Sequence, residues 1–186
     1  MSTVSGRRAP ASHAPGFLGR PPDQLGFVTG DLASTVGALA RAWGSGPWEV
    51  YEYTAATLRH RSYRGRPGVF ESRNAVAPGG RLGVVQPVTG PSVHADALRA
   101  RGPGLAYVTW FVTDLRPVAE HMARAGIGEA MRGGGHGLDG DGEFVYFDTA
   151  GSLGVYSQYA VAPARRHPPI GRLEIDGTAG WRLVEP

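Results

Sequence analysis

Two segments of the chain repeat the same order of apolar and polar positions. Residues 24–32 are matched 83 positions later by residues 107–115. Each segment alternates with a period of two, which predicts a β-strand, and then reaches Asp-Leu ahead of a helical pattern, which predicts an N-capping aspartate. Gly44 and Gly126 follow the helical patterns and are expected to end both helices. A repeat of this kind indicates two copies of one structural unit.

Further strands complete each copy in the order β-α-β-β-β. Aromatic and β-branched residues, interrupted by turn residues, predict the remaining elements. In the first copy, strands are expected at 48–53, 69–77 and 82–85. In the second copy, we expect a strand at 105–112, a helix at 115–125, and strands near 128–132, 144–148 and 153–160. Neither copy can close a core alone, so the two sheets should join into one cupped mixed sheet or half-barrel of the α+β class.

Composition suggests how the chain is divided. Residues 1–22 are rich in proline and glycine and are expected to form a flexible tail. Residues 23–161 are expected to form one domain, with modules at 23–87 and 104–161 joined by a linker helix within 88–103 that Ser92 can cap. Residues 162–186 form a C-terminal extension, which could be an added hairpin or disordered.

Several chemistries are excluded by residue content. The 186 residues contain no cysteine, so disulfides and thiolate catalysis are excluded. All 19 basic residues are arginine, so Schiff-base and phosphate-loop lysines are excluded as well. The net charge of +3 gives weak support for nucleic acid, and neither a signal peptide nor a membrane span is recognisable. We therefore expect a soluble, cytoplasmic protein that binds a small molecule, and neither nucleic acid nor a membrane.

The paired units resemble the vicinal oxygen chelate superfamily, which includes glyoxalases, methylmalonyl-CoA epimerases, extradiol dioxygenases and bleomycin-resistance proteins. The resemblance covers residues 23–161 and is to the epimerase-like or glyoxalase-like branch. Residues 85–92 are similar to the end of the first module in epimerase-like members. Residues 146–154 are similar to the hairpin that closes the second module. The resemblance implies a ligand site in the cup but leaves the chemistry open.

The resemblance also implies where a metal would be held, with one ligand on the first and last strand of each module. These positions fall on Gln24, Gly83, Tyr107 and Gln158. None of them is a histidine or a carboxylate, and neutral amides are poor ligands for a catalytic divalent ion. We therefore expect no metal and no other cofactor.

A pocket of hydrogen-bonding and aromatic residues is expected on the concave face. The period of two turns one set of residues to that face: Gln24, Gly26, Tyr107, Thr109, Tyr156 and Gln158. Gly83 leaves space beside them, and either Tyr107 or Tyr156 could act as an acid or as a donor to an oxyanion. Ordinary packing of these strand residues is the alternative.

Carboxylates on two strands of the first module are candidate general bases. Glu49 and Glu71 are the candidates, with Tyr51 and Arg73 as ligand contacts. Which side of strand 48–53 faces the cup is ambiguous, although its more apolar side, Trp48, Val50 and Glu52, is expected to pack on the helices. Solvated charges are the alternative for these side chains.

Two polar segments and one histidine each have a functional and a purely structural interpretation. The basic segment 59–66 could hold an acidic ligand or RNA, but we expect a solvated hairpin loop. Residues 139–143 have the alternating oxygens of a calcium loop without its spacing, so we expect a mobile loop. His94, in the linker helix, could reach the edge of the cup or lie on the surface.

Two functions are therefore open. One is a metal-independent enzyme of isomerase, lyase or cyclase type, acting on a small aromatic or polyketide-like metabolite. The other is a protein that sequesters such a metabolite, as the resemblance to bleomycin-resistance proteins implies. A metal-dependent epimerase, glyoxalase or dioxygenase is a third and weaker hypothesis.

A homodimer is expected from the habit of the family and from the apolar faces that cupped sheets leave exposed. Sedimentation in an analytical ultracentrifuge should give the mass of two chains. A single-chain mass at high protein concentration would contradict this expectation.

Overall fold

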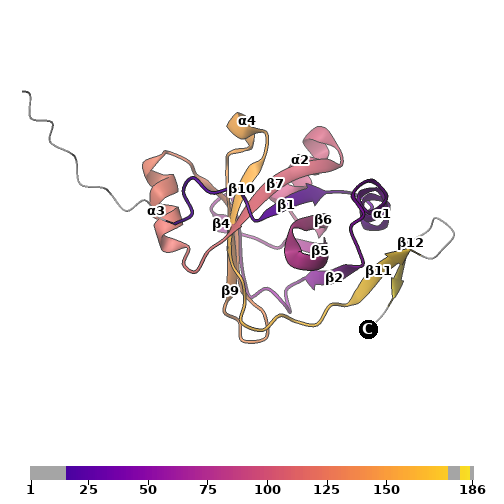
Figure 1. Ribbon diagram of the computed structural model, residues 1–186. Coiled ribbons are helices and arrows are strands. Elements are labelled where there is room, and N and C mark those ends of the chain that lie inside the picture. Colours follow the sequence, from indigo (N-terminus) through magenta and orange to yellow (C-terminus); the bar gives the residue numbers. More distant parts are fainter. Residues whose placement is uncertain (1–15, 176–180, 185–186) are drawn as a thin grey trace, which may run out of the picture.

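One curved, mixed sheet forms the body of the protein in the computed structural model, which describes residues 16–175 and 181–184 (Figure 1). Along the sheet the strands follow the order β12-β11-β2-β5-β6-β1-β7-β10-β9-β8-β3-β4. The strands are β1 Gln24–Val28, β2 Trp48–Tyr53, β3 His60–Tyr63, β4 Arg66–Pro67, β5 Glu71–Val76, β6 Leu82–Thr89, β7 Gly104–Phe111, β8 Glu129–His136, β9 Gly142–Phe147, β10 Tyr156–Val161, β11 Gly171–Ile175 and β12 Trp181–Val184. The helices are α1 Leu32–Trp43, α2 Val93–Arg101, α3 Arg116–Arg124 and α4 Ala150–Leu153, with a 3₁₀ turn η1 at Pro78–Gly80.

The chain contains two modules of the same topology. The first consists of β1, α1, β2, β5 and β6, and the second of β7, α3, β8, β9 and β10. Within the sheet they follow the matching orders β1-β6-β5-β2 and β7-β10-β9-β8. The predicted α+β fold of two tandem modules in one cupped sheet is thus confirmed. The strands differ in detail, since β6 and β8 run on to Thr89 and His136, while α4 delays the start of β10 to Tyr156.

The modules meet where β1 and β7 pair antiparallel. Leu25 lies opposite Val108, Gln24 opposite Thr109 and Gly26 opposite Tyr107. The 83-position repeat maps the first pair onto itself and exchanges the other two. The register of this joint therefore agrees with the equivalence of Gln24 and Tyr107 that the sequence predicts.

The two predicted capping aspartates have different outcomes. The Asp31 carboxylate accepts a hydrogen bond from the backbone N–H of Ser34 at 3.0 Å, so it is the N-cap of α1 as predicted. The prediction is wrong for Asp114, because the N-cap of α3 is Leu115, without a side-chain capping bond, and the Asp114 carboxylate accepts from the backbone N–H of Arg116 at 2.8 Å instead. Gly44 and Gly126 follow the helices with φ of 67° and 71°. The left-handed conformation ends a helix at little cost when the residue is glycine, as predicted.

Each outer edge of the two-module sheet is covered by a segment from elsewhere in the chain. The hairpin β3–β4, inserted in the first module, pairs with β8 of the second. The hairpin β11–β12, which follows the second module, pairs with β2 of the first. The basic segment 59–66 thus belongs to a hairpin, and the C-terminal extension takes the hairpin alternative over 171–175 and 181–184. Covering edge strands in this way prevents edge-to-edge association.

The N-terminal segment is partly packed. Residues 1–15 of the expected tail lie outside the described residues. Phe17 is buried against Tyr159, with ring centroids 5.3 Å apart. The Arg20 guanidinium donates to the backbone oxygen of Phe111 at 2.6 Å. Residues 17–20 therefore contact the second module.

Packing against α1 decides which side of β2 faces the cup. Val36 and Leu39 of α1 belong to one buried cluster with Trp48 and Val50. Burying this apolar side against the helix is favourable by roughly 1.5–3 kcal/mol for each large side chain. The opposite side, which carries Glu49 and Tyr51, therefore points into the cup. This agrees with the expectation for Trp48 and Val50, whereas Glu52, which was expected on the same side, is among the residues that line the cavity.

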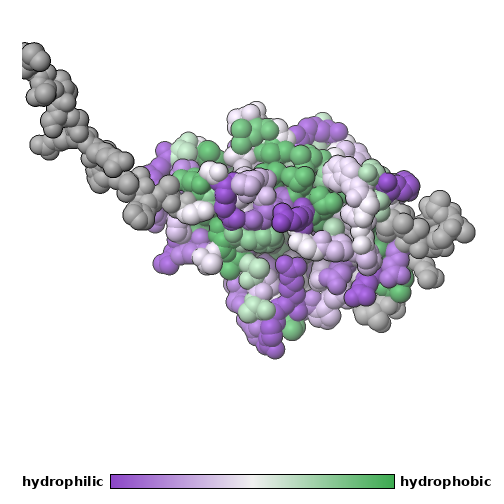
Figure 2. Space-filling view, viewed as in Figure 1, coloured by the Kyte–Doolittle hydropathy of each residue, from purple (hydrophilic) through white to green (hydrophobic). Residues whose placement is uncertain are grey.

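Apolar side chains are also exposed on the upper face of the molecule as drawn, near α2 and α4 (Figure 2). Exposed apolar side chains of the described residues include Leu153 of α4 at 67%, Val88 of β6 at 53% and Leu105 of β7 at 41%. Contact with another protein surface is more favourable for such side chains than contact with water. Within the described residues, no helix has the length and apolar character needed to cross a membrane.

Aromatic rings inside the cup lie directly on glycines of the neighbouring strand. Tyr107 lies opposite Gly26, and Phe144 opposite Gly133. A Cβ atom at Gly26 would lie 2.1 Å from the Tyr107 ring, and one at Gly133 would lie 2.3 Å from the Phe144 ring. These contacts leave no room for a methyl group. The missing side chain on one strand therefore provides the space for the ring on the next.

Replacing Gly26 by alanine should destabilise the protein by about 1–3 kcal/mol, because the added methyl group displaces Tyr107 in a packed core. Denaturant unfolding measures this directly. Gly30→Ala is the matched control, since a Cβ there meets no atom within 4 Å and the backbone φ is not positive. Equal stability of the two variants would contradict the packing described here.

Candidate functional site

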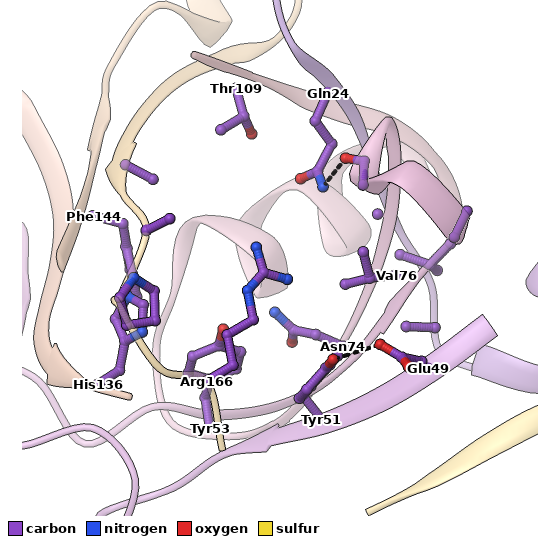
Figure 3. A pocket seen from close by; sticks show the side chains of 18 of the residues that line it. Gln24, Glu49, Tyr51, Tyr53, Asn74, Val76, Thr109, His136, Phe144 and Arg166 are labelled. Carbon is purple, nitrogen blue, oxygen red and sulfur yellow. Dashed lines mark hydrogen bonds between the residues drawn. The ribbon is translucent and has the colours of Figure 1, made fainter. Parts of the chain in front are cut away.

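A cavity of about 680 Å³ opens into the cup between the two modules (Figure 3). Its walls come from β1, β2, β5, β6, β7, β8, β9, β10 and β11, from the turn η1, and from the segment 162–170 that links β10 to β11. The volume is typical of a site for a small organic ligand. Both modules and the C-terminal extension thus contribute to one site.

The joint between the modules forms one wall of this cavity. The Gln24 amide nitrogen donates to the Gly80 backbone oxygen at 2.7 Å, and the Thr109 hydroxyl donates to the Gln158 amide oxygen at 2.5 Å. A Cβ at Gly83 would lie 3.1 Å from the Gln24 amide oxygen and 3.3 Å from the Tyr107 hydroxyl oxygen. The side chains of Gln24 and Tyr107 therefore converge in the space that Gly83 leaves.

Members of the vicinal oxygen chelate superfamily that use a metal hold it at four positions. The residues at these positions in this chain do not offer a metal-binding donor set. They supply two amides, one phenol and one hydrogen atom, and the amide oxygen of Gln158 already accepts from Thr109. Among residues 16–175 and 181–184, no group of three or more histidine, cysteine or acidic side chains could hold a metal ion. These residues do not fit a catalytic divalent ion.

Two buried phenols are part of the cavity wall, and a buried histidine contacts one of them from behind. Tyr107 and Tyr146 line the cavity and are 4% and 3% exposed, and burial raises the pKa of both hydroxyls above the usual 10.0. The Tyr146 hydroxyl is 3.0 Å from Nε2 of His94, whose pKa is lowered by burial to about 3. His94, left open between cup edge and surface, is thus a buried neutral residue. At neutral pH the two phenols keep their protons and can donate hydrogen bonds.

The β2 wall carries a hydrogen-bonded pair that faces the cavity. The Tyr51 hydroxyl donates to the Glu49 carboxylate at 2.7 Å (Figure 3). Burial, and then the neighbouring Glu49, raise the pKa of Tyr51 to about 12, while Arg166 acts in the opposite direction. The second Glu49 oxygen lies 3.7 Å from the Arg172 guanidinium. The phenol thus holds the carboxylate in position.

Aromatic side chains from β2, β8 and β9 form the adjoining wall. The Tyr53 ring makes edge contacts with His136 and Phe144, with centroid separations of 5.8 and 6.4 Å. Burial, and then the charge of Arg166, lower the pKa of His136 to about 4. This wall is therefore uncharged at neutral pH. Offset and edge contacts with such rings favour an aromatic ligand.

The structure brings most of the sequence-predicted site residues to this cavity, but not all of them. Those that line it are Gln24, Glu49, Tyr51, Gly83, Tyr107, Thr109 and Gln158. Tyr156, Glu71 and Arg73 are not among the lining residues. Tyr156 packs in a buried cluster, and burial followed by the Asp148 and Asp96 carboxylates raises its pKa.

The orientation of β5 explains why Glu71 and Arg73 do not line the cavity. This strand turns Asn74 and Val76 to the cavity, so the alternate residues point away (Figure 3). Arg73 forms an ion pair with Glu52 at 2.7 Å, and the Glu71 carboxylate accepts from the backbone N–H of Ala55 at 3.4 Å. Neither side chain reaches the site.

Sequence reasoning missed several residues that line the cavity: Tyr53, Asn74, His136, Phe144, Tyr146 and Arg166. The period of two along β9 could have identified Phe144 and Tyr146. His136 lies in a part of β8 that was not predicted as strand. Arg166 lies in a segment without periodicity, so its position depends on contacts distant in sequence.

Two tandem β-α-β-β-β modules that share one cupped sheet have the architecture of the vicinal oxygen chelate fold. One similar solved structure is a variant of methylmalonyl-CoA epimerase from Streptomyces coelicolor in complex with 2-nitronate-propionyl-CoA, with 16% identity, a TM-score of 0.51, and coverage of 77% of this chain and 97% of that one. A hypothetical protein from Bacillus halodurans has 9% identity and a TM-score of 0.53, with 79% and 97% covered. A variant of 4-hydroxymandelate synthase from Streptomyces coelicolor has 17% identity and a TM-score of 0.52, with 80% and 41% covered.

These similarities concern the fold alone. No protein-family model and no curated protein sequence matches the chain. The comparisons therefore assign no chemistry to the cup.

The buried histidines make stability depend on pH. Their folded pKa values, about 3 for His94 and about 4 for His136, lie below the ordinary 6.5, so the unfolded chain binds more protons at intermediate pH. Stability should be full above pH ~6.5 and fall as the pH approaches 4, by about 2 kcal/mol for each histidine at pH 5. Urea unfolding at pH 8 and pH 5 measures the loss.

His94→Gln should remove about half of this pH dependence, because it removes one of the two groups. An unchanged difference between pH 8 and pH 5 in that variant would show that His94 is not a buried neutral histidine.

Proposed function

We propose that the protein is a cofactor-free enzyme of isomerase, lyase or cyclase type that acts on a small aromatic or polyketide-like metabolite in the cup. One observation carries the proposal. The Glu49 carboxylate, positioned by Tyr51, and the buried phenols of Tyr107 and Tyr146 face one cavity. A base and protonated donors in one enclosed site are the requirements for proton transfer at a carbon next to a carbonyl.

Each group has a role in this proposal. Glu49 removes the proton from that carbon, and the electron pair of the C–H bond moves toward the carbonyl oxygen to give an enolate. Tyr107 donates a hydrogen bond to the enolate oxygen, which stabilises the charge that develops. The proton then returns at another carbon, a leaving group departs, or the enolate carbon attacks a second carbonyl. These outcomes correspond to an isomerase, a lyase and a cyclase.

We infer that this chemistry uses no metal. The donor set at Gln24, Gly83, Tyr107 and Gln158 supports this inference, since a divalent ion needs about three good ligands. The Tyr107 phenol takes the place of a Lewis acid beside the substrate oxygen. Two of the similar structures are enzymes by name, an epimerase and a synthase, which is compatible with catalysis on this fold.

A metabolite-binding resistance protein is the second candidate. The uncharged aromatic wall of Tyr53, Phe144 and His136 favours it, because sequestration requires apolar contact and no base. The two functions predict different effects of the same substitutions.

Glu49→Gln and Tyr107→Phe should each lower turnover by ~10²-fold or more if these groups transfer protons or stabilise the enolate. Exchange of the carbon-bound proton in D₂O, followed by ¹H NMR with aromatic β-dicarbonyl compounds as probes, measures turnover. In a pure binder, Tyr107→Phe should cost only ~0.5–1.5 kcal/mol of affinity, the contribution of one hydrogen bond.

Matched variants lie on the neighbouring strands, Glu71 on β5 beside β2 and Tyr156 on β10 beside β7. Glu71→Gln and Tyr156→Phe make the same chemical changes at side chains that do not line the cavity, so turnover should be retained. If these two variants lose turnover while Glu49→Gln keeps it, the proposed roles are wrong.

A further inference from the structure

Segment 162–170, called the strap below, crosses the open side of the cup from the second module to the first (Figure 1). Four of its residues line the cavity: Ala162, Pro163, Arg166 and His167. The side chain of Arg166 points into the middle of the cavity (Figure 3). The strap thus brings a guanidinium into a site otherwise built by the sheet.

Contacts with both modules fix the strap. On the side of the second module, the backbone N–H of Leu138 donates to the Arg165 oxygen at 2.9 Å, and Arg165 forms an ion pair with Asp139. The Asp141 carboxylate accepts from the backbone N–H of Ala164 at 3.0 Å. The loop at 139–143, expected to be mobile, is therefore bonded to the strap.

The other end of the strap is held by the first module. The backbone N–H of Ile170 donates to the Val50 oxygen of β2 at 2.8 Å, and β11 then continues as a strand beside β2. At the end near the second module, Pro163 packs closely on Gly137, where a Cβ would lie 2.3 Å from the proline Cβ. With both ends fixed, the backbone that carries Arg166 is held in place over the cavity. Such preorganisation lowers the entropic cost of binding.

The charges around the cavity leave Arg166 uncompensated. The two lining carboxylates already have basic partners, Glu49 with Arg172 at 3.7 Å and Glu52 with Arg73 at 2.7 Å. Within the described part of the chain, no carboxylate forms an ion pair with Arg166. Arg166 is exposed to solvent at the open side of the cup, where a cation without a counter-ion attracts an anionic group of an entering ligand.

The groups nearest to Arg166 are suited to the same ligand. Asn74 accepts from the Ser72 hydroxyl through its amide oxygen at 2.8 Å, which leaves its NH₂ group to donate into the cavity (Figure 3). The aromatic rings of Tyr53, His136 and Phe144 form the wall beside it. A planar guanidinium binds a carboxylate through two parallel hydrogen bonds, while the rings contact an aromatic body.

We propose that Arg166 is the recognition residue for a carboxylate on an aromatic small-molecule ligand, which it holds against the Tyr53–Phe144 wall. This inference names the substrate class and rests on the proposed function for the use of the same cavity. Since Arg166 lies near Tyr51, which bonds Glu49, a carboxylate held there places the rest of the ligand beside the Glu49–Tyr51 pair. Arg166 thereby sets specificity, and the other residues carry out the proton transfer.

Binding of 2-naphthoate and its neutral amide, 2-naphthamide, to the full chain tests this inference by isothermal titration calorimetry. The unmodified protein should prefer the carboxylate. Arg166→Gln should weaken naphthoate binding by about 10- to 100-fold, because a charge-assisted pair is lost, and change naphthamide binding by no more than about threefold. Arg166→Lys keeps the charge without the fork and should recover only part of the affinity.

Arg124→Gln is the matched control for the loss of one positive charge, since Arg124 is 66% exposed on α3. It should leave both affinities unchanged. Equal affinity for carboxylate and amide, no naphthoate binding at millimolar concentration, or full naphthoate affinity in a folded Arg166→Gln protein would overturn the inference. Glu49→Gln should keep the preference for the carboxylate. A failure of the proposed catalysis is therefore distinguishable from a failure of carboxylate recognition.

Discussion

The contact between the Tyr107 ring and Gly26 holds the two modules and the site together. The two residues lie directly opposite each other across the antiparallel pair β1–β7, and the ring occupies the space where a side chain at position 26 would lie. In the same wall, the Tyr107 hydroxyl and the Gln24 amide both border the space that Gly83 leaves. A joint between two repeated modules thus becomes a hydrogen-bonding wall of the cavity, and the phenol that seals the joint is also the proposed donor to a substrate oxygen.

Segments that cross between the modules complete the cup around this joint. The hairpin β3–β4 extends from the first module to β8, and the C-terminal extension returns from the second module to β2. The second crossing carries Arg166 over the cavity. Among the described residues, the other arginine and the two carboxylates that line the cavity all have ion-pair partners, whereas Arg166 has none in this part of the chain. The repeated modules supply the enclosed volume and the phenols, whereas the non-repeated segment supplies the charge that we propose selects the ligand.

Local patterns were sufficient to predict the fold and the joint. The period of two and the 83-position repeat predicted both modules, and Asp31 was correctly predicted as an N-cap, whereas Asp114 was not. The apolar pattern of β2 favoured the side with Glu49 and Tyr51 as the inward one without deciding it. The facing of β5 was not predictable in this way, because its sequence from Glu71 to Val76 has no continuous apolar side. Arg166 could not be predicted either, since the strap is positioned by hydrogen bonds to residues that are distant in sequence.

The central claim is that the chemistry of the cup belongs to its own side chains, at positions where the resembling superfamily places metal ligands. Elemental analysis of the purified protein tests it most directly, combined with the affinity for 2-naphthoate before and after treatment with a chelator. The account predicts no stoichiometric zinc, iron, nickel or manganese, and an affinity that the chelator leaves unchanged. One equivalent of metal, lost together with binding on chelation, would contradict it.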